Sequence, residues 1–405
     1  MEPTFSYIYS IPYIILFFIY FLLFLWENKM RKKNMNIKTI RYFSMFVFII
    51  FFGCRGFIDT DFAVYFPLYE NAPTLFDTNG VAKYFSDINK DYLTRIEPGF
   101  KVFIILLKTL SSEYFLLQFV SSSIDIILLD YIFRKYSPQY ILSFIIFFIF
   151  SGFVIELNLM RNIKSILLFI ISLKYIQERN AVKFFILNGI GLLFHSSAIF
   201  YFPMYFFLHK KIPSAFVWIM FIIGNAIYLA QIKFITPIVI SLGSLFGGIY
   251  SLMADAYSKS DLYSNSYGIT MGFIERSLTF VLLYKSYNKI REYIKDDNLL
   301  NIFYNSFFLY SVSYLFLSEY SIFIDRLTTL FVFSYWILYP YFYVTLSERI
   351  KSLFTIGLFF FGTYKMYKGN NFITRKYENI IWDNPTITNA YYILNKHLDK
   401  LLNPK

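Results

Sequence analysis

Cysteine, histidine and charged residues are scarce in this chain of 405 residues. It has one cysteine, Cys54, and three histidines, and only 16% of its residues are Asp, Glu, Lys or Arg. A single cysteine excludes an intramolecular disulfide and a cysteine-based metal cluster. The low charge stands against 57% hydrophobic and 23% aromatic residues, and a soluble core cannot hide so much apolar surface. We therefore expect a polytopic membrane protein.

Apolar runs alternate with short polar loops along most of the chain. Every backbone polar group in lipid must be paired within the protein, so such runs are expected to be helices. The pattern predicts an all-α bundle of about 11–12 transmembrane helices with additional re-entrant or interfacial segments. One domain is expected over 1–368, including an outer loop at 56–97, followed by a polar tail at 369–405. The approximate spans are 7–26, 40–54, 114–133, 140–155, 161–175, 215–230, 269–284, 299–317, 327–346 and 353–367.

Basic residues set the predicted orientation of these spans. The formal charge of +12 comes largely from Lys and Arg in short loops, which indicates topology rather than a nucleic-acid surface. The loop 27–41 is strongly basic and is expected in the cytoplasm, whereas 56–97 is rich in acids and is expected outside. We predict a multi-pass protein of a bacterial inner membrane, with its active site facing the periplasm or the cell exterior.

Three apolar segments do not read as simple spans. Gly99–Leu110 is too short, because roughly twenty residues are needed to cross. Residues 182–208 form either one long helix or two short ones that meet at His195, and the pair keeps the basic end at 209–211 inside. Residues 232–250 contain Pro237 and several glycines, which favours a broken or interfacial segment.

Charged side chains recur at the predicted outer ends of the helices, against the usual positive-inside bias. Guanidinium groups bind phosphates through a planar fork and keep their charge, so a pyrophosphate at the outer leaflet is their natural partner. In the alternative, each arginine pairs with a neighbouring carboxylate, as Asp325 with Arg326, or snorkels to the headgroups. The arginines are Arg55, Arg161 and Arg326, with Arg276 in the first half of a later span; the carboxylates are Asp59, Asp61, Glu97 and Glu156.

Short motifs follow one another along the chain: Arg55 followed by Asp59-Thr-Asp61-Phe and Tyr65, Glu97-Pro-Gly-Phe, Met160-Arg161-Asn162, Phe194-His195-Ser196-Ser197-Ala198 and Asp325-Arg326. This ordered set resembles the EpsG-like and Wzy-type polysaccharide polymerases of bacterial envelopes. After Arg161 the chain has Asn-Ile-Lys in place of the family's more usual Gln-Gly-Ile, and Gly56-Phe57-Ile58 replaces a small glycine-rich turn.

The resemblance implies a glycosyltransferase-C-like membrane fold that joins polyprenyl-pyrophosphate-linked oligosaccharide repeat units. A sugar hydroxyl would attack the anomeric carbon of another unit and expel the lipid pyrophosphate. Asp61 or His195 would act as the general base, although His195 could equally be a core histidine bound to a helix carbonyl. We expect no cofactor and no divalent metal; the partners are the lipid-linked oligosaccharide, the bilayer and a possible chain-length regulator, with no nucleic acid. The implied catalytic residues are Asp61, His195 and Glu97, and the implied substrate-binding residues are Arg55, Asp59, Tyr65, Arg161, Arg276 and Arg326.

Two other functions fit parts of the pattern. A membrane glycosyltransferase that uses a lipid-phosphate sugar would carry an early acidic pair, which Asp59 and Asp61 could supply. A flippase for lipid-linked oligosaccharides would have a basic cavity, but its cationic residues should be spread through the spans. The acceptor and the product distinguish the lipid-phosphate-dependent glycosyltransferase from a polymerase. The pattern of surface polysaccharide distinguishes a flippase from a polymerase.

Overall fold

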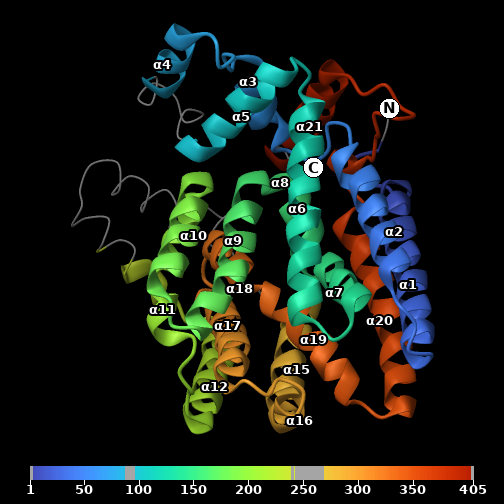
Figure 1. The fold of residues 1–405 in the computed structure, drawn as a ribbon, viewed down its shortest axis with the longest axis vertical. Coiled ribbons are helices and arrows are strands. Elements are labelled where there is room, and N and C mark those ends of the chain that lie inside the picture. The colour runs from blue at the N-terminus through green and yellow to red at the C-terminus, as the bar shows by residue number, and fades with distance from the viewer. Residues whose placement is uncertain (1–2, 87–95, 239–240, 242–268, 403–405) are drawn as a thin grey trace. The chain divides into compact units, whose positions relative to one another are not determined.

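The computed structural model describes residues 3–86, 96–238, 241 and 269–402. In this part of the chain the secondary structure is helical, and strand-like pairing is limited to two isolated bridges, Phe5 with Phe372 and Arg55 with Asn379. The predicted all-α class is therefore confirmed (Figure 1). The broken segment expected at 232–250 falls largely outside the described residues.

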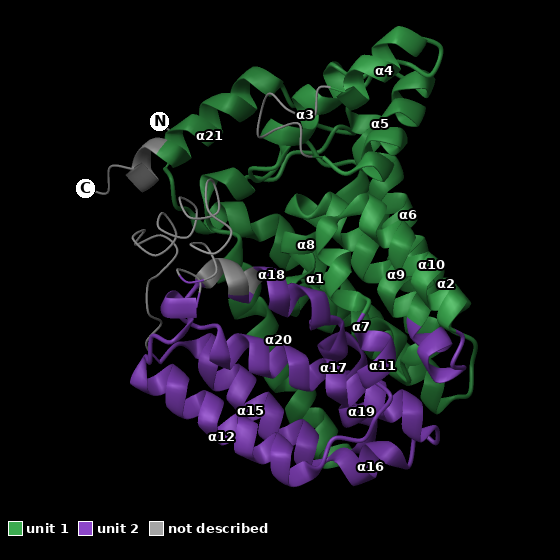
Figure 2. Ribbon diagram, turned by 90° about the vertical axis from the view of Figure 1, so that its left-hand side faces the viewer, with its two compact units in different colours: residues 1–172, 181–202, 346–405 green, residues 173–180, 203–345 purple. Residues whose placement is uncertain are grey.

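The chain divides into two compact units, coloured separately in Figure 2. Unit 1 holds 1–172, 181–202 and 346–405, and unit 2 holds 173–180 and 203–345. The helices of unit 1 are α1 (Ile11–Lys32), α2 (Lys38–Phe48), α3 (Phe62–Glu70), α4 (Thr78–Ser86), α5 (Pro98–Leu110), α6 (Phe115–Tyr136), α7 (Tyr140–Phe147), α8 (Phe153–Asn158), most of α9 (Met160–Gln177), α10 (Ala181–Phe194), α20 (Glu348–Gly369) and α21 (Ile387–Leu402). Unit 2 has α11 (Met204–Phe207), α12 (Ser214–Ala230), α15 (Met271–Lys285), α16 (Tyr287–Arg291), α17 (Asp297–Phe316), α18 (Ser321–Phe331) and α19 (Phe333–Thr345).

Four helical stretches among the described residues are long and apolar enough to cross a membrane. The remaining predicted spans correspond to helices that are shorter or less apolar, among them α10 and α12. The helix α2 continues into a π-helical turn, η2 (Ile49–Gly53). The segment η5 (Phe148–Gly152) joins α7 to α8 through a kink, because Phe150 and Ser151 have non-helical backbone dihedrals. The four stretches are Tyr7–Lys32, Phe115–Tyr136, Tyr140–Asn158 and Asp297–Phe316.

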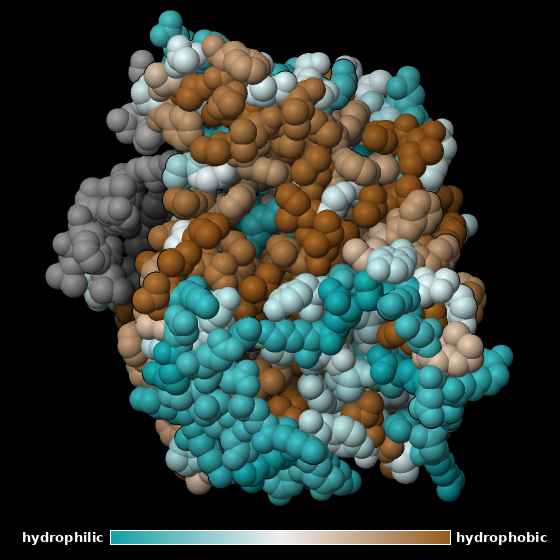
Figure 3. Space-filling model, in the orientation of Figure 1, coloured by the Kyte–Doolittle hydropathy of each residue, from teal (hydrophilic) through white to brown (hydrophobic). Residues whose placement is uncertain are grey.

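Apolar surface remains exposed on these helices, as expected where lipid is the solvent. Phe18 and Leu22 of α1 keep nearly half of their surface exposed, although neighbouring Phe17 and Tyr20 are fully buried in unit 1. Apolar residues also cover a broad area of the face drawn in Figure 3. One stripe of α1 therefore packs inward while another is suited to acyl chains.

Polar contacts within unit 1 join helix ends that the loop charges assign to the same side of the membrane. At the predicted inner end Lys32 pairs with Glu348, 3.0 Å apart, and Arg41 pairs with Asp130 at 3.0 Å. At the other end the side chain of Ser10, the N-cap of α1, donates to the carbonyl of Tyr367 in α20. The relative directions of these spans agree with the expectation. Which group of ends faces the cytoplasm stays a prediction.

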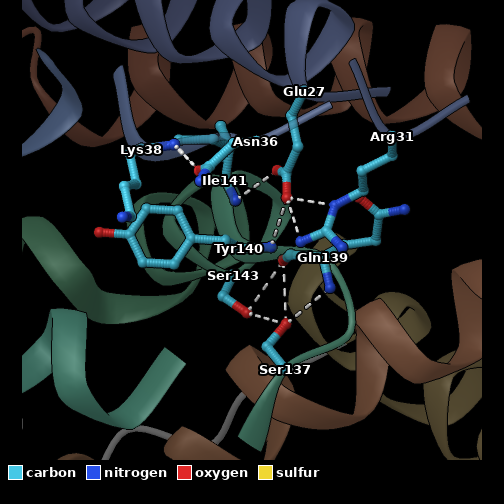
Figure 4. A network of polar contacts seen from close by, with 9 residues as sticks. All are labelled: Glu27, Arg31, Asn36, Lys38, Ser137, Gln139, Tyr140, Ile141 and Ser143. Atoms are coloured by element: carbon cyan, nitrogen blue, oxygen red, sulfur yellow. Dashed lines mark hydrogen bonds and ion pairs between the residues drawn. The ribbon is translucent and has the colours of Figure 1, made fainter. Parts of the chain in front are cut away.

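A carboxylate from α1 fixes the beginning of α7 at the inner end (Figure 4). Glu27 is fully buried and accepts the backbone N–H groups of Tyr140 and Ile141 at 3.0 and 2.7 Å. It also binds Arg31, one turn further along α1, at 2.7 Å. Helix N-termini carry free N–H donors, so this carboxylate supplies a cap from another helix.

The loop predicted at 56–97 is helical over much of its described part, which excludes 87–95. Its helices α3 and α4, together with α5, are called the outer cap, after its predicted side of the membrane. Tyr65 and Tyr69 of α3 pack with Phe100 of α5 against the ends of α6 and α9. The short helix predicted at 99–110 is confirmed as α5, with 13 residues. Gly99 is required where α5 meets α10, because a Cβ there would lie 2.7 Å from the carbonyl oxygen of Leu193.

Residues 182–208 are broken at His195, as the two-helix alternative predicts. The helix α10 ends at Phe194, and a 3₁₀ helix, η6 (Ser196–Tyr201), packs back onto it. The break leaves His195 with extended backbone dihedrals at the N-cap of η6.

The C-terminal segment, expected to be a polar tail, folds back onto unit 1. Its backbone pairs with the loop after η2, where Gly56 N–H donates to the Glu378 carbonyl at 2.8 Å and Ile380 N–H to the Cys54 carbonyl at 2.9 Å. The amphipathic α21 then buries Ala390 and Leu394 with Phe62 at the start of α3. This segment completes the outer end of unit 1.

Candidate functional site

Arg161 is the second residue of α9 and lies at the centre of the outer cap. Its guanidinium forms an ion pair with Glu97, and its Nε donates to the Tyr65 hydroxyl at 3.4 Å. The guanidinium carbon is also 5.9 Å from the centre of the Tyr65 ring. About a fifth of the Arg161 side chain (21%) remains exposed, so part of the fork can still reach a ligand. Three separate chain segments thus meet at one cation.

Glu97 connects Arg161 to the turn that follows α10. One oxygen of Glu97 pairs with Arg161, and the other accepts the backbone N–H of Ser196 at 2.8 Å. The position of Glu97 just before Pro98, the first residue of α5, follows from the Glu-Pro-Gly-Phe motif, since proline is favoured at the start of a helix.

His195 is connected through Ser197 to Asn162, the third residue of the Met-Arg-Asn motif. Its Nδ1 accepts the backbone N–H of Ser197 at 3.2 Å and lies 2.7 Å from the Ser197 hydroxyl. That hydroxyl donates to the side-chain oxygen of Asn162 at 2.9 Å. The structure therefore brings His195 to the same end of α9 as Arg161, with one ring nitrogen already engaged.

Asp61 stands at the beginning of α3, and its charge is balanced by opposing neighbours. Burial raises the pKa of Asp61 to about 6; the nearby Asp59 carboxylate adds to the rise, and Arg161 opposes it. Burial raises the pKa of the Tyr65 hydroxyl to about 12, so this group stays neutral at ordinary pH. Asp61 is thus a carboxylate whose proton affinity suits acid–base work near neutrality.

Asp59 faces the C-terminal segment. Its carboxylate forms a buried ion pair with Arg375, and its backbone N–H donates to the Thr374 carbonyl at 2.7 Å. The residue has a φ of 70°, a left-handed conformation that aspartate tolerates better than most residues. Arg375 thereby fixes the turn from which Asp61 is presented.

Arg55 lies deeper than the groups around Arg161. It is 2% exposed, and its guanidinium donates to the Phe52 carbonyl and, at 3.2 Å, to the Ser122 hydroxyl of α6. On the adjoining helix Lys164 forms an ion pair with Asp125 and donates to the Ser121 hydroxyl at 2.8 Å. A buried polar layer therefore lies beneath the outer cap, where α6 and α9 would otherwise be apolar.

Glu156 belongs to the same buried layer. It is 2% exposed, and its Oε1 has no hydrogen-bond partner among the described residues. Among its charged neighbours, Asp125 disfavours a negative charge on Glu156, whereas Lys164 and Arg55 favour one. Buried charges of both signs compensate one another here, and their cost within a membrane bundle favours a functional reason for keeping them.

The two remaining predicted arginines belong to unit 2. Arg276 of α15 donates to the Tyr310 hydroxyl at 2.9 Å and stacks on the Tyr314 ring, 4.1 Å from its centre. Arg326 has an exposed side chain and lies inside α18, so its predicted place in a turn at a helix end is wrong. The turn is made earlier, because Tyr320 already is the N-cap of α18.

Sequence reasoning missed several residues of the site. Arg375 sits in a stretch without periodicity or motif, and only the folded chain shows that it meets Asp59. Lys164 had a signal, because it is the charged residue by which this chain departs from the usual sequence after Arg161. The partner Asp125 could have been sought as the acid needed to neutralise it within a membrane helix.

These residues define a helical membrane protein with a cluster of acids, a partly exposed guanidinium and a tyrosine at the predicted outer end of unit 1. The model of the EpsG family matches residues 38–381, which is most of the chain. The chain therefore belongs to the EpsG family, whose members are Wzy-like polymerases. No curated protein and no solved structure was found to match it.

Proposed function

We propose that this protein joins polyprenyl-pyrophosphate-linked oligosaccharide repeat units at the outer face of the bacterial inner membrane. The observation that carries the proposal is the position of Arg161, held by Glu97 and Tyr65 at the first turn of α9 with Asp61 nearby. A helix N-terminus adds free N–H donors and a favourable dipole to the guanidinium, and this combination suits a phosphate.

In the proposed reaction a sugar hydroxyl attacks the anomeric carbon of a second repeat unit. The new C–O bond forms as the bond to the lipid pyrophosphate breaks, and the hydroxyl proton passes to the carboxylate of Asp61. Arg161 offsets the negative charge that grows on the departing pyrophosphate. Glu97 orients the guanidinium, because one of its oxygens is itself anchored by the Ser196 N–H.

The other predicted residues take supporting roles in this proposal. His195 is the alternative general base, but its Nδ1 is engaged with Ser197, so a proton would have to reach the other nitrogen. Asp59 holds the Asp61 turn through Arg375, and Arg55 contributes positive charge from below. Arg276 and Arg326 remain proposed substrate-binding residues, both within unit 2.

The test in cells is removal of the protein followed by gel analysis of surface polysaccharide. A polymerase predicts that the ladder collapses to a single repeat unit. Loss of every surface repeat would instead indicate a flippase, and an unchanged ladder would contradict both functions.

The acidic pair keeps a lipid-phosphate-dependent glycosyltransferase as the second candidate. The two enzymes differ in donor, so the purified protein in liposomes should be offered each in turn. Polymer formed from pyrophosphate-linked oligosaccharide supports the proposal. Transfer of a single sugar from a lipid monophosphate, with no polymer from the other donor, would replace it.

A further inference from the structure

Unit 2 contains a cavity of about 220 Å³, and its lining includes none of the candidate site residues described above. It lies among the start of α12, the end of α15, α16 and the first turns of α17. Its lining is Lys211, Ile212, Ser214, Val217, Trp218, Tyr284, Tyr287, Asn288, Arg291, Asn301, Tyr304 and Asn305. Aromatic rings and amides make up most of this lining.

The walls of the cavity are braced by their own contacts. The rings of Tyr287 and Tyr304 are 4.8 Å apart, and the Tyr304 hydroxyl donates to the Leu283 carbonyl at 2.9 Å. The amide of Asn305 donates to the carbonyls of Leu208 and Lys210, at 2.8 and 2.7 Å. The loop before α12 is thereby fixed to α17, and the cavity does not depend on a ligand to hold it open.

The charge of the lining is positive. Lys211 and Arg291 contribute two cations, and no carboxylate belongs to the described lining. Arg291 is already paired with Asp297 through two hydrogen bonds of 2.9 and 2.8 Å. Lys211 is exposed and has no hydrogen bond or ion pair with any other described residue. The lining therefore contains one cation without a described partner, among tyrosine hydroxyls and asparagine amides.

An apolar surface begins next to the cavity. Ser214, Val217 and Trp218 of α12 line it, and the adjoining positions Phe216 and Ile219 are about half exposed, at 49% and 53%. The exposed apolar surface continues along α12 through Ile222 at 64%. A ligand with an anionic head and hydrocarbon chains would satisfy both surfaces at once, and aromatic residues are favoured at such a headgroup level.

We propose that this cavity binds the phosphate headgroup of an anionic membrane lipid, with Lys211 contacting the phosphate and the acyl chains lying along the exposed face of α12. Basic pockets between membrane helices at the predicted cytoplasmic side are suited to such headgroups. The site is separate in the chain from Arg161 and does not depend on the polymerase reaction.

The full-length protein, purified in a non-ionic detergent, provides the test. The probe is dihexanoyl phosphatidylglycerol, and the comparisons are dihexanoyl phosphatidylcholine, with the same chains but no net charge, and inorganic phosphate. Binding is followed by titration calorimetry and by the tryptophan fluorescence that Trp218 contributes. Lys211→Gln removes the proposed contact, Lys211→Arg keeps the charge, and Lys289→Gln is the matched control on α16, outside the lining.

The anionic lipid is expected to bind saturably, with at least roughly tenfold weaker binding in Lys211→Gln because a charge-assisted contact is lost. Lys211→Arg and Lys289→Gln should bind as the parent protein does. Equal binding of phosphatidylcholine would overturn recognition of charge. Equal affinity for inorganic phosphate would make a free anion the ligand, and an unaffected Lys211→Gln with an unchanged melting temperature would overturn the site.

Discussion

At the scale of single residues, Arg161 carries the greatest weight in the proposed reaction. A planar two-pronged donor can grip a pyrophosphate in a way that a point charge cannot. Arg161→Ala is expected to abolish polymer, and Arg161→Lys to leave a small residual activity. Losing one prong of a charge-assisted contact predicts roughly a ten- to hundredfold fall in rate. Polymerisation in liposomes measures the effect.

The matched control for Arg161 is Arg349→Ala, which removes an exposed arginine near the start of α20. Both variants must reach the membrane in normal amount for the comparison to hold. Full activity in a well-expressed Arg161→Ala protein would contradict the proposed binding of pyrophosphate by Arg161 and indicate a structural role.

The proton affinity of Asp61 predicts the acid limb of the pH–rate profile. A general base must be deprotonated, so the rate should fall as pH drops through about 6, the raised pKa of Asp61. Because the Asp59 charge contributes to that rise, Asp59→Asn should move the limb to lower pH. The double variant Asp59→Asn/Arg375→Gln removes both partners of the ion pair and controls for an unpaired buried arginine. A limb that stays in place in both variants would show that Asp61 does not govern it.

A further prediction at this scale is that polymerisation needs no divalent metal, because the arginines can compensate pyrophosphate charge. Activity in liposomes should survive excess chelator. Loss with EDTA and recovery with magnesium or manganese would instead make Asp59 and Asp61 ligand candidates and favour the lipid-phosphate transferase.

At the scale of elements, the carboxylate of Glu27 decides how α7 begins. Glu27→Ala leaves the N–H groups of Tyr140 and Ile141 without their acceptor, at a cost of about 1–3 kcal/mol for each buried group. Glu27→Gln keeps one acceptor oxygen and should be milder. Thermal unfolding in detergent measures both, and Glu348→Gln, an exposed glutamate, is the control. Equal melting of Glu27→Ala and the control would contradict the capping role.

The helices and breaks that could be predicted are those indicated by residues of the same short stretch of sequence. The break at His195 and the short α5 follow from polar residues and from the length of an apolar run, and both are found. The turn at Asp325 and Arg326 was misplaced by several residues, because a charged pair inside α18 resembles a helix end. The sequence predicts that Arg161, Glu97 and Tyr65 lie on the same side of the membrane. It does not predict that Arg161 contacts the other two. Arg375 and Lys164 were missed, since a contact between distant segments leaves no local pattern.

At the scale of the whole molecule, the orientation in the membrane depends on which of the two groups of helix ends faces the cytoplasm. Single cysteines at Asn36 and Asn79, in a Cys54→Ser background, report on the basic loop and the outer cap. Treatment of intact cells with an impermeant thiol reagent should label position 79 and spare position 36. The reverse pattern would overturn the orientation and every outer-face role. Labelling both positions after permeabilisation controls for accessibility.

The backbone pairing between the loop after η2 and the C-terminal segment also has a consequence for biosynthesis. Asp59 is synthesised before the predicted spans that follow it, whereas its buried partner Arg375 is synthesised after them. The nascent chain must therefore insert those spans before the turn that presents Asp61 acquires its final support. A chain truncated before Arg375 would lack the partner that holds this turn, so the site can be completed only after translation has passed Arg375.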